Sequence, residues 1–169
     1  KQDGFIRRYA KANRGLAQFQ TDTARYRELQ ADITQEESAH TINFIKIDCT
    51  LLKAALIGHC VQWQGKLTGL LNQNALAELR GLHELFESTT EKLRVQPLNL
   101  DHLSESWNLL EGMKGDVENI ENKFTPLEEM YGILAKFEVQ TAEEEQSMLS
   151  DLRPAGEEFK TMLKEVEQV

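Results

Sequence analysis

The chain has 169 residues, which is enough for one domain with a core and excludes two large ones. Hydrophobic residues make up 40% and charged residues 28%, as in ordinary soluble proteins, and no apolar run approaches the roughly 20 residues that span a bilayer. The net charge of −9 gathers towards the C-terminus, where residues 101–169 hold seventeen Asp/Glu and six Lys/Arg. This acidity argues against nucleic acid as a main partner.

The N-terminal stretch is basic instead. Residues 1–30 hold seven Lys/Arg against three Asp/Glu, so this stretch forms either a solvated helix face or a contact with an acidic partner. The chain begins with Lys1 and has no signal-peptide pattern, and we therefore expect it to be a segment of a longer protein.

The first predicted helix covers residues 4–33. Its apolar side chains recur at steps of three and four residues, which is typical of a heptad-like seam. The large rings in this seam favour a helix of a bundle over one strand of a coiled coil. The seam residues are Phe5, Tyr9, Ala12, Leu16, Phe19, Thr23, Tyr26, Leu29 and Ile33.

The polar stretch 34–40 ends this helix. Residues 41–48 (TINFIKID) are β-branched and aromatic and too few for a helix, so they predict an extended connector or a short strand. We expect the isoleucines and Phe44 of this connector to pack against the bundle. Asp48 is expected at the N-cap of the next helix, where its carboxylate would accept hydrogen bonds from free backbone amides.

The longest predicted helix covers residues 48–93, and the rest of the chain is expected to cover it. Its buried stripe skips around Asn72–Asn74, which predicts a bend or a break there. The stripe comprises Leu52, Leu56, Cys60, Trp63, Leu67, Leu70, Leu79, Leu82, Phe86, Thr89 and Leu93.

The C-terminal part predicts further helices after a turn at Pro97. Asn99 is expected to cap a helix that runs to about Phe124. Residues 125–128 (TPLE) have the pattern of a capping box with proline at the first helical position, which marks either a kink or a true turn. A second capping box at residues 141–144 (TAEE) begins the last helix, which residues 153–156 (RPAG) are expected to interrupt.

These patterns predict an all-α fold. We expect an elongated antiparallel bundle of about four to six long helices, with a short extended connector at Thr41–Asp48. The predicted structural core comprises Leu16, Phe19, Tyr26, Leu56, Trp63, Leu67, Trp107, Leu110, Ile120, Phe124, Tyr131 and Leu134.

No motif in the sequence predicts catalysis, a cofactor or a metal site. The glycines are isolated inside helical patterns, and His40, His59, His83 and His102 share no ligand spacing. His59 and Cys60 are neighbours, but adjacent helical residues point about 100° apart and form no dyad. Cys49 and Cys60 would lie roughly 16 Å apart along one helix, so they cannot bond to each other, and buried free thiols suit a reducing compartment.

Two stretches carry a family resemblance. The phrase FIKIDCTLLKAAL followed by HCVQWQGKLTGLL, and the later PLEEMYGILAKFEV followed by TAEEEQSMLSDL, resemble the dynein heavy chain tail in order and spacing over residues 41–152. The later stretch is the more specific, and its matching residues are Pro126, Tyr131, Leu134, Val139 and Glu143 or Glu144.

The resemblance is to the C-terminal part of the tail, just ahead of the linker, and is closer to axonemal heavy chains than to the cytoplasmic one. One departure is that the family places an aromatic residue after the final leucine, whereas this chain has Arg153-Pro154-Ala155-Gly156. The resemblance therefore implies a tail segment over residues 1–152 and the helical start of the junction toward the linker over residues 153–169. It does not fix the residue at which the linker begins.

By the same resemblance, the parent protein is an ATP-driven microtubule motor whose ATPase ring lies outside this sequence. The segment would be a non-catalytic mechanical and assembly element without a cofactor, located in the cytoplasm or cytoskeleton, in the ciliary axoneme. Its partners would be other dynein heavy, intermediate or light chains and the adjacent linker, with no nucleic acid, membrane or small-molecule substrate. The alternative is an unrelated helical scaffold, such as a spectrin-like or tethering-complex rod.

Overall fold

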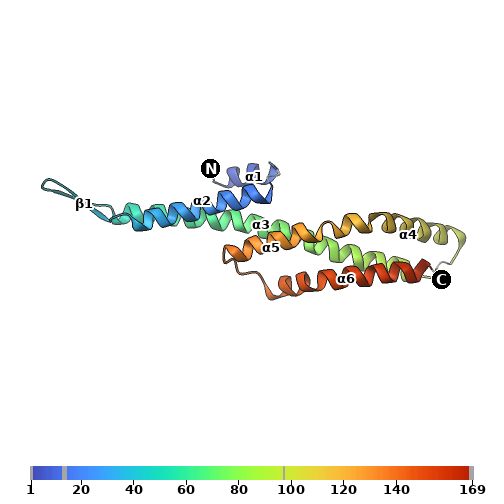
Figure 1. Cartoon of the computed structure of the whole chain (residues 1–169). Coiled ribbons are helices and arrows are strands. Elements are labelled where there is room, and N and C mark those ends of the chain that lie inside the picture. The colour runs from blue at the N-terminus through green and yellow to red at the C-terminus, as the bar shows by residue number, and fades with distance from the viewer. Residues whose placement is uncertain (1, 13–14, 97, 168–169) are drawn as a thin grey trace. The chain divides into compact units, whose positions relative to one another are not determined.

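The computed structural model describes residues 2–12, 15–96 and 98–167, and helix accounts for 83% of these residues. This confirms the all-α class. The elements are α1 (Gln2–Lys11), α2 (Leu16–Gln35), β1 (Ala39–Ile42), β2 (Ile45–Asp48), α3 (Thr50–Arg94), α4 (Leu100–Glu121), α5 (Phe124–Lys136) and α6 (Glu143–Glu167) (Figure 1). They divide into two compact units, residues 1–71 (unit 1) and residues 72–169 (unit 2).

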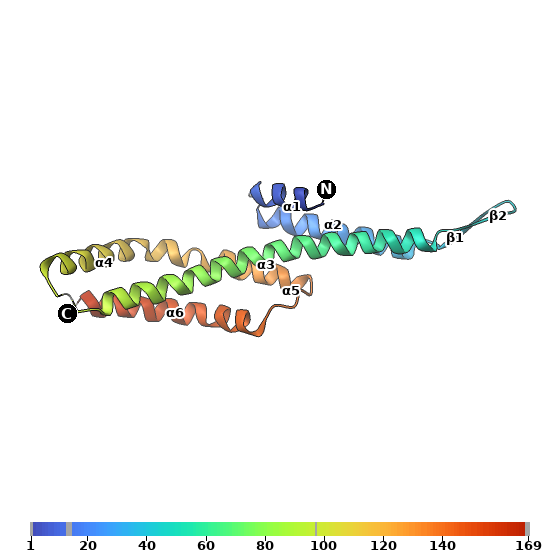
Figure 2. The same ribbon diagram turned by 180° about the vertical axis from the view of Figure 1, so that it is seen from behind.

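In unit 1, the predicted single helix over residues 4–33 is wrong, because the structure has α1 and α2 in its place. Gly15 has extended backbone angles and precedes α2, and glycine weakens a helix at that point. The break lets α1 pack beside α2 (Figure 2). Tyr9 then meets the edge of Phe19 with ring centroids 5.6 Å apart, and its hydroxyl donates to Asp22 Oδ2 at 2.6 Å.

The predicted connector after α2 is an antiparallel β-hairpin. Ile42 lies opposite Ile45 across a two-residue turn, in which Asn43 has a φ of 56°. Figure 1 shows this hairpin projecting past the neighbouring ends of α2 and α3. The expectation that its apolar side chains pack against the helices is wrong, since Phe44 is 94% exposed.

Helix α3 is continuous, so the predicted break at Asn72–Asn74 is not present. The skip in the stripe instead coincides with the division between the two units. At its start, Asp48 Oδ1 accepts from the Thr50 amide at 2.9 Å and from the Thr50 hydroxyl, and these bonds lower the pKa of Asp48. The residue in the cap position is Cys49, whose carbonyl accepts from the Lys53 amide, so Asp48 lies one residue earlier than expected.

Unit 2 packs α4, α5 and α6 with the second half of α3 around one core. Asn99 caps α4 as predicted, accepting from the His102 amide at 2.8 Å. The predicted capping box at residues 125–128 is wrong, because α5 begins at Phe124 and its cap residue makes no side-chain bond. The helix thus begins with a buried residue, Phe124, just before the Thr125-Pro126 pattern.

Helix α6 runs through Pro154, so the predicted interruption is wrong. Proline inside a helix costs about 3 kcal/mol, and the burial of Leu152, Gly156 and Phe159 against unit 2 offsets that cost. The capping box at residues 141–144 is also wrong, since Ala142 precedes the helix and Thr141 Oγ1 accepts from the side chain of Gln146.

Two residues of the predicted core are exposed. Leu56 is 43% exposed because only α2 covers α3 near the hairpin, and Trp107 is 53% exposed because no described element covers the first turns of α4. Leu16, Tyr26 and Trp63 are half-buried. The buried members are Phe19, Leu67, Leu110, Ile120, Phe124, Tyr131 and Leu134.

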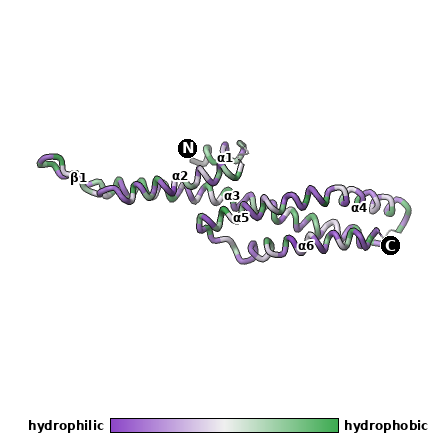
Figure 3. Tube along the Cα trace, viewed as in Figure 1, coloured by the Kyte–Doolittle hydropathy of each residue, from purple (hydrophilic) through white to green (hydrophobic). Residues whose placement is uncertain are grey.

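Hydrophilic and hydrophobic positions alternate along the helices of each unit (Figure 3). This alternation fits helices that each bury one stripe. None of the described helices is both long and apolar enough to cross a membrane.

Candidate interaction surfaces

The histidine and the two cysteines singled out in the sequence do not form a reactive pair. His59 Nε2 accepts a hydrogen bond from Trp63 Nε1 at 3.1 Å, while the neighbouring Cys60 is buried. Cys49 and Cys60 are both free thiols. Within the ranges that the structure describes, no group of three His, Cys, Asp or Glu side chains is placed to hold a metal ion. The candidate sites described below are two surface grooves.

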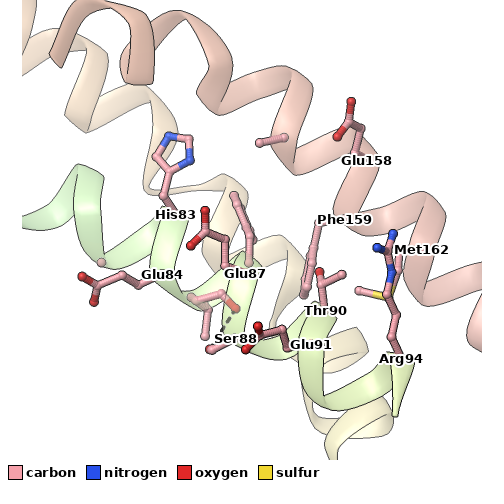
Figure 4. Close-up of a pocket in the computed structure, with 14 residues that line it drawn as sticks. His83, Glu84, Glu87, Ser88, Thr90, Glu91, Arg94, Glu158, Phe159 and Met162 are labelled. Carbon is pink, nitrogen blue, oxygen red and sulfur yellow. Dashed lines mark hydrogen bonds between the residues drawn. The ribbon is translucent and has the colours of Figure 1, made fainter. Parts of the chain in front are cut away.

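The first surface is a groove of about 960 Å³ between α3 and α6, here called the α3–α6 groove. Its floor is aromatic: Phe86 of α3 and Phe159 of α6 are buried with ring centroids 4.9 Å apart, and Phe86 also meets Phe124 edge-on. Figure 4 shows Phe159 reaching from α6 towards α3. These rings hold the two helices together beneath the groove.

The rim of the α3–α6 groove is acidic. Glu84, Glu87 and Glu91 lie on one face of α3 at steps of three and four residues, and Glu158 lies on α6 (Figure 4). Among the described residues, none of these four carboxylates forms an ion pair, and Arg94 is the one Lys or Arg that lines the groove. The rim is therefore a strip of like charges that repel one another and would attract a basic surface.

The second surface is an apolar groove of about 980 Å³ beside the start of α4, here called the α4–α6 groove. Leu100, Leu103 and Trp107 of α4 are exposed along it, and Met162 and Val166 of α6 line the opposite side. Exposed apolar patches of this kind are typical of protein contact sites.

Ion pairs hold α6 against the rest of unit 2. Arg153 on α6 makes two bonds to Glu128 on α5, at 2.6 and 2.7 Å, and this bidentate contact lowers the pKa of Glu128. Lys160 pairs with Glu121 of α4. Nearer the end of α6, Glu167 accepts from Lys114 of α4 at 2.7 Å and raises the pKa of that lysine.

A buried polar contact adds to these links. The hydroxyl of Tyr131 on α5 lies 3.4 Å from Glu145 Oε2 in the first turn of α6, and both side chains are buried. Burial first, and the Glu145 carboxylate second, raise the pKa of Tyr131 to about 12. The N-terminal end of α6 favours the carboxylate at this position.

Comparison with known sequences identifies the family of the chain. The family model described as "Dynein axonemal heavy chain 2/5/8 coiled-coil" matches residues 65–169, which is more than half of the chain. The chain belongs to this dynein axonemal heavy chain family. The match includes the whole of unit 2 and the last residues of unit 1.

Similar proteins are axonemal dynein heavy chains. The Dynein-1-beta heavy chain of the flagellar inner arm I1 complex of Chlamydomonas reinhardtii is 39% identical over 163 residues, or 96% of this chain. Dynein axonemal heavy chain 2 of Mus musculus is 35% identical over 167 residues, or 99% of this chain. The dynein gamma chain of the flagellar outer arm of Chlamydomonas reinhardtii is 25% identical over 158 residues, or 94% of this chain. The chain spans 4% of the length of each.

The resemblance drawn from the sequence is thereby confirmed: the chain is a tail segment of an axonemal dynein heavy chain. The alternative of an unrelated spectrin-like or tethering-complex rod is set aside. Sequence reasoning missed the acidic rim of the α3–α6 groove, because Glu84, Glu87 and Glu91 alone indicate a solvated face. Only the fold brings Glu158 to the same groove.

Proposed function

We propose that this dynein segment is a non-catalytic mechanical and assembly element. It lies in the C-terminal part of the tail, just ahead of the linker, and joins the base attached to cargo or to a doublet to the ATP-driven microtubule motor. Residues 1–152 form the stem part, and residues 153–169 form the helical start of the junction. The uninterrupted course of α6 supports a stiff passage between the two parts.

The observation that carries this proposal is the way α6 is held in unit 2. The contact of Phe159 with Phe86 links α6 to α3, and ion pairs link α6 to α4 and α5. A force along α6 therefore passes to three other helices. The partners are other heavy, intermediate or light chains and the adjacent linker. Two relatives are named for the inner and outer arms of flagella, which supports an axonemal location.

The test uses the purified dynein that contains the parent heavy chain. Phe159→Ala removes one of the two rings beneath the α3–α6 groove and lowers the free energy of unfolding of unit 2 by about 3–5 kcal/mol. We expect ATP hydrolysis by the motor to persist while microtubule gliding slows. The substitution does not touch the ATPase ring, but it weakens the segment that would pass force from the motor to the base. Glu105→Gln, at an exposed position of α4, is the control and leaves both unchanged.

A loss of ATP hydrolysis in proportion to gliding would place this segment within the catalytic machinery instead. Unchanged gliding by a variant shown to be loosened by hydrogen exchange would mean that the segment carries no load.

A further inference from the structure

The connection between α2 and α3 is longer than the loop that usually joins two antiparallel helices, and it contains a β-hairpin. Antiparallel helices are usually joined by about 2–8 residues, yet residues 36–49 separate these two. The base of the connection is fixed: the ammonium of Lys53 donates to the carbonyls of Thr34 and Glu36 at 2.8 and 2.7 Å, and the Cys49 amide donates to Ser38 at 2.7 Å. These bonds join the two helix ends at the base of the hairpin, so the hairpin is not needed to close the connection.

The register of the hairpin makes it amphipathic. Opposite residues of an antiparallel pair share a face, and alternate pairs change face. The pairs Ile42–Ile45 and His40–Ile47 therefore lie on one face. The pairs Thr41–Lys46 and Ala39–Asp48 lie on the other. The first face holds three isoleucines beside His40, and the second holds Thr41, Lys46 and Asp48 beside Ala39.

The apolar face is open to solvent. Ile42, Ile45 and Ile47 are 59%, 55% and 43% exposed, and Phe44 in the adjacent turn is 94% exposed. A two-stranded hairpin is marginally stable by itself, and exposing apolar side chains adds to that cost. Nothing among the described residues covers this face.

We propose that the hairpin is a docking element that places Phe44 and the three isoleucines in an apolar pocket of a different protein chain. Large aromatic side chains are the usual anchors of such contacts. Within the part of the chain that the structure describes, the outer edge of each strand is unpaired, so the rim of the pocket can add backbone hydrogen bonds. The inference does not depend on whether the segment carries load.

The small area of the apolar face argues against the same hairpin of a second copy as the occupant. Four partly exposed apolar side chains offer on the order of 400–500 Å². Two such faces stacked on each other would bury less than the roughly 1,200 Å² of a stable interface. A pocket that surrounds the hairpin gains contact with both strands and with the turn.

The local charge argues against a lipid surface. The hairpin and its base contain Glu36, Glu37 and Asp48 against Lys46 and Lys53. The ammonium of Lys53 is held by two backbone carbonyls. Attraction to anionic headgroups needs a cluster of Lys and Arg side chains, which is not present here.

The test compares amide hydrogen exchange over residues 39–48 in the isolated chain and in purified dynein that contains the parent heavy chain. We expect exchange to slow by about tenfold or more in the assembled protein. Phe44→Ser should abolish this protection, and Lys46→Ser on the polar face should preserve it. Neither variant should change the melting of the isolated chain, since both side chains are exposed.

A photoreactive benzoylphenylalanine at position 44 then identifies the neighbour in the purified dynein. Cross-linking to a polypeptide of different sequence supports the proposal. Cross-linking to any part of a second copy, to another part of the same heavy chain or to lipid, equal exchange in both samples, or protection that survives Phe44→Ser would each overturn it. So would a dimer of the isolated chain that sedimentation shows to depend on Phe44.

Discussion

Gly156 lies where α6 approaches the ring of Phe124 on α5. A Cβ at this position would lie 3.0 Å from two atoms of that ring, which is buried and packed edge-on against Phe86. Because the ring is buried and packed against Phe86, we expect Gly156→Ala to destabilise unit 2 by about 1–2 kcal/mol, despite the better helix propensity of alanine.

The matched control for Gly156 is Gly132 on α5, where a Cβ would meet nothing within 4 Å. Gly132→Ala should stabilise the chain by about 0.5–1 kcal/mol through helix propensity alone. Urea denaturation measures both free energies of unfolding. If both substitutions changed the free energy of unfolding in the same direction, the Phe124 ring would be shown to move aside.

Tyr131 predicts a loss of stability at high pH. Its pKa is about 12 in the folded chain, because of burial and the nearby Glu145, against about 10 in the unfolded chain. The folded state thus holds this proton more tightly. The contribution of the protonated Tyr131 to the free energy of unfolding is fully present below pH 10. It is lost as the pH rises from 10 to 12, by on the order of 2 kcal/mol.

Tyr131→Phe removes this titration, so the variant should lose less stability than the parent chain between pH 9 and pH 11.5. The comparison of the two chains by urea denaturation cancels the effect of the other tyrosines. Identical pH profiles would mean that Tyr131 titrates near its ordinary pKa in the folded chain.

At the scale of elements, Trp63 and Trp107 behave differently although sequence periodicity treats them alike. Trp63 on α3 stacks on Tyr26 of α2 with ring centroids 5.7 Å apart and meets Phe5 of α1 at 5.2 Å. We expect Trp63→Ala to cost about 3 kcal/mol and to release α1, whereas the exposed Trp107 should tolerate Ala at under about 1 kcal/mol.

Hydrogen exchange distinguishes these outcomes, because release of α1 appears as faster exchange over residues 4–11. If Trp63→Ala left that exchange unchanged, the aromatic contacts would not be what holds α1. If Trp107→Ala cost as much as Trp63→Ala, the start of α4 would be covered in solution.

The helical class, the cap at Asn99 and most inward stripes could be predicted because they depend on spacing within one helix. The start of a second helix at Leu16 and the passage of α6 through Pro154 could not. Both go with contacts that the local pattern does not show: Tyr9 of α1 packs on Phe19 of α2, and Leu152, Gly156 and Phe159 of α6 are buried in unit 2. The hairpin was missed as a unit because Asn43 is followed by Phe44 rather than by the glycine that usually signals such a turn.

At the scale of the whole molecule, charge is unevenly distributed. Residues 72–169 hold 21 Asp/Glu and 9 Lys/Arg, and four of the carboxylates, Glu84, Glu87, Glu91 and Glu158, border the α3–α6 groove. Like charges at this spacing repel one another when salt is low, since the Debye length is about 30 Å at 0.01 M and about 3 Å at 1 M. Unit 2 should therefore be more stable in high salt.

Thermal unfolding in increasing NaCl tests this, and we expect the midpoint to rise by several degrees between about 0.01 and 0.5 M. The variant with all four groove carboxylates changed to Gln should be more stable than the parent chain at low salt, because the repulsion across the groove is removed. It should also respond less to salt. Changing the four exposed acids Asp101, Glu105, Asp116 and Glu129 to Asn or Gln reduces the charge equally at dispersed positions and serves as the control. An equal response in both variants would mean that net charge, rather than the acidic rim, governs the stability of unit 2.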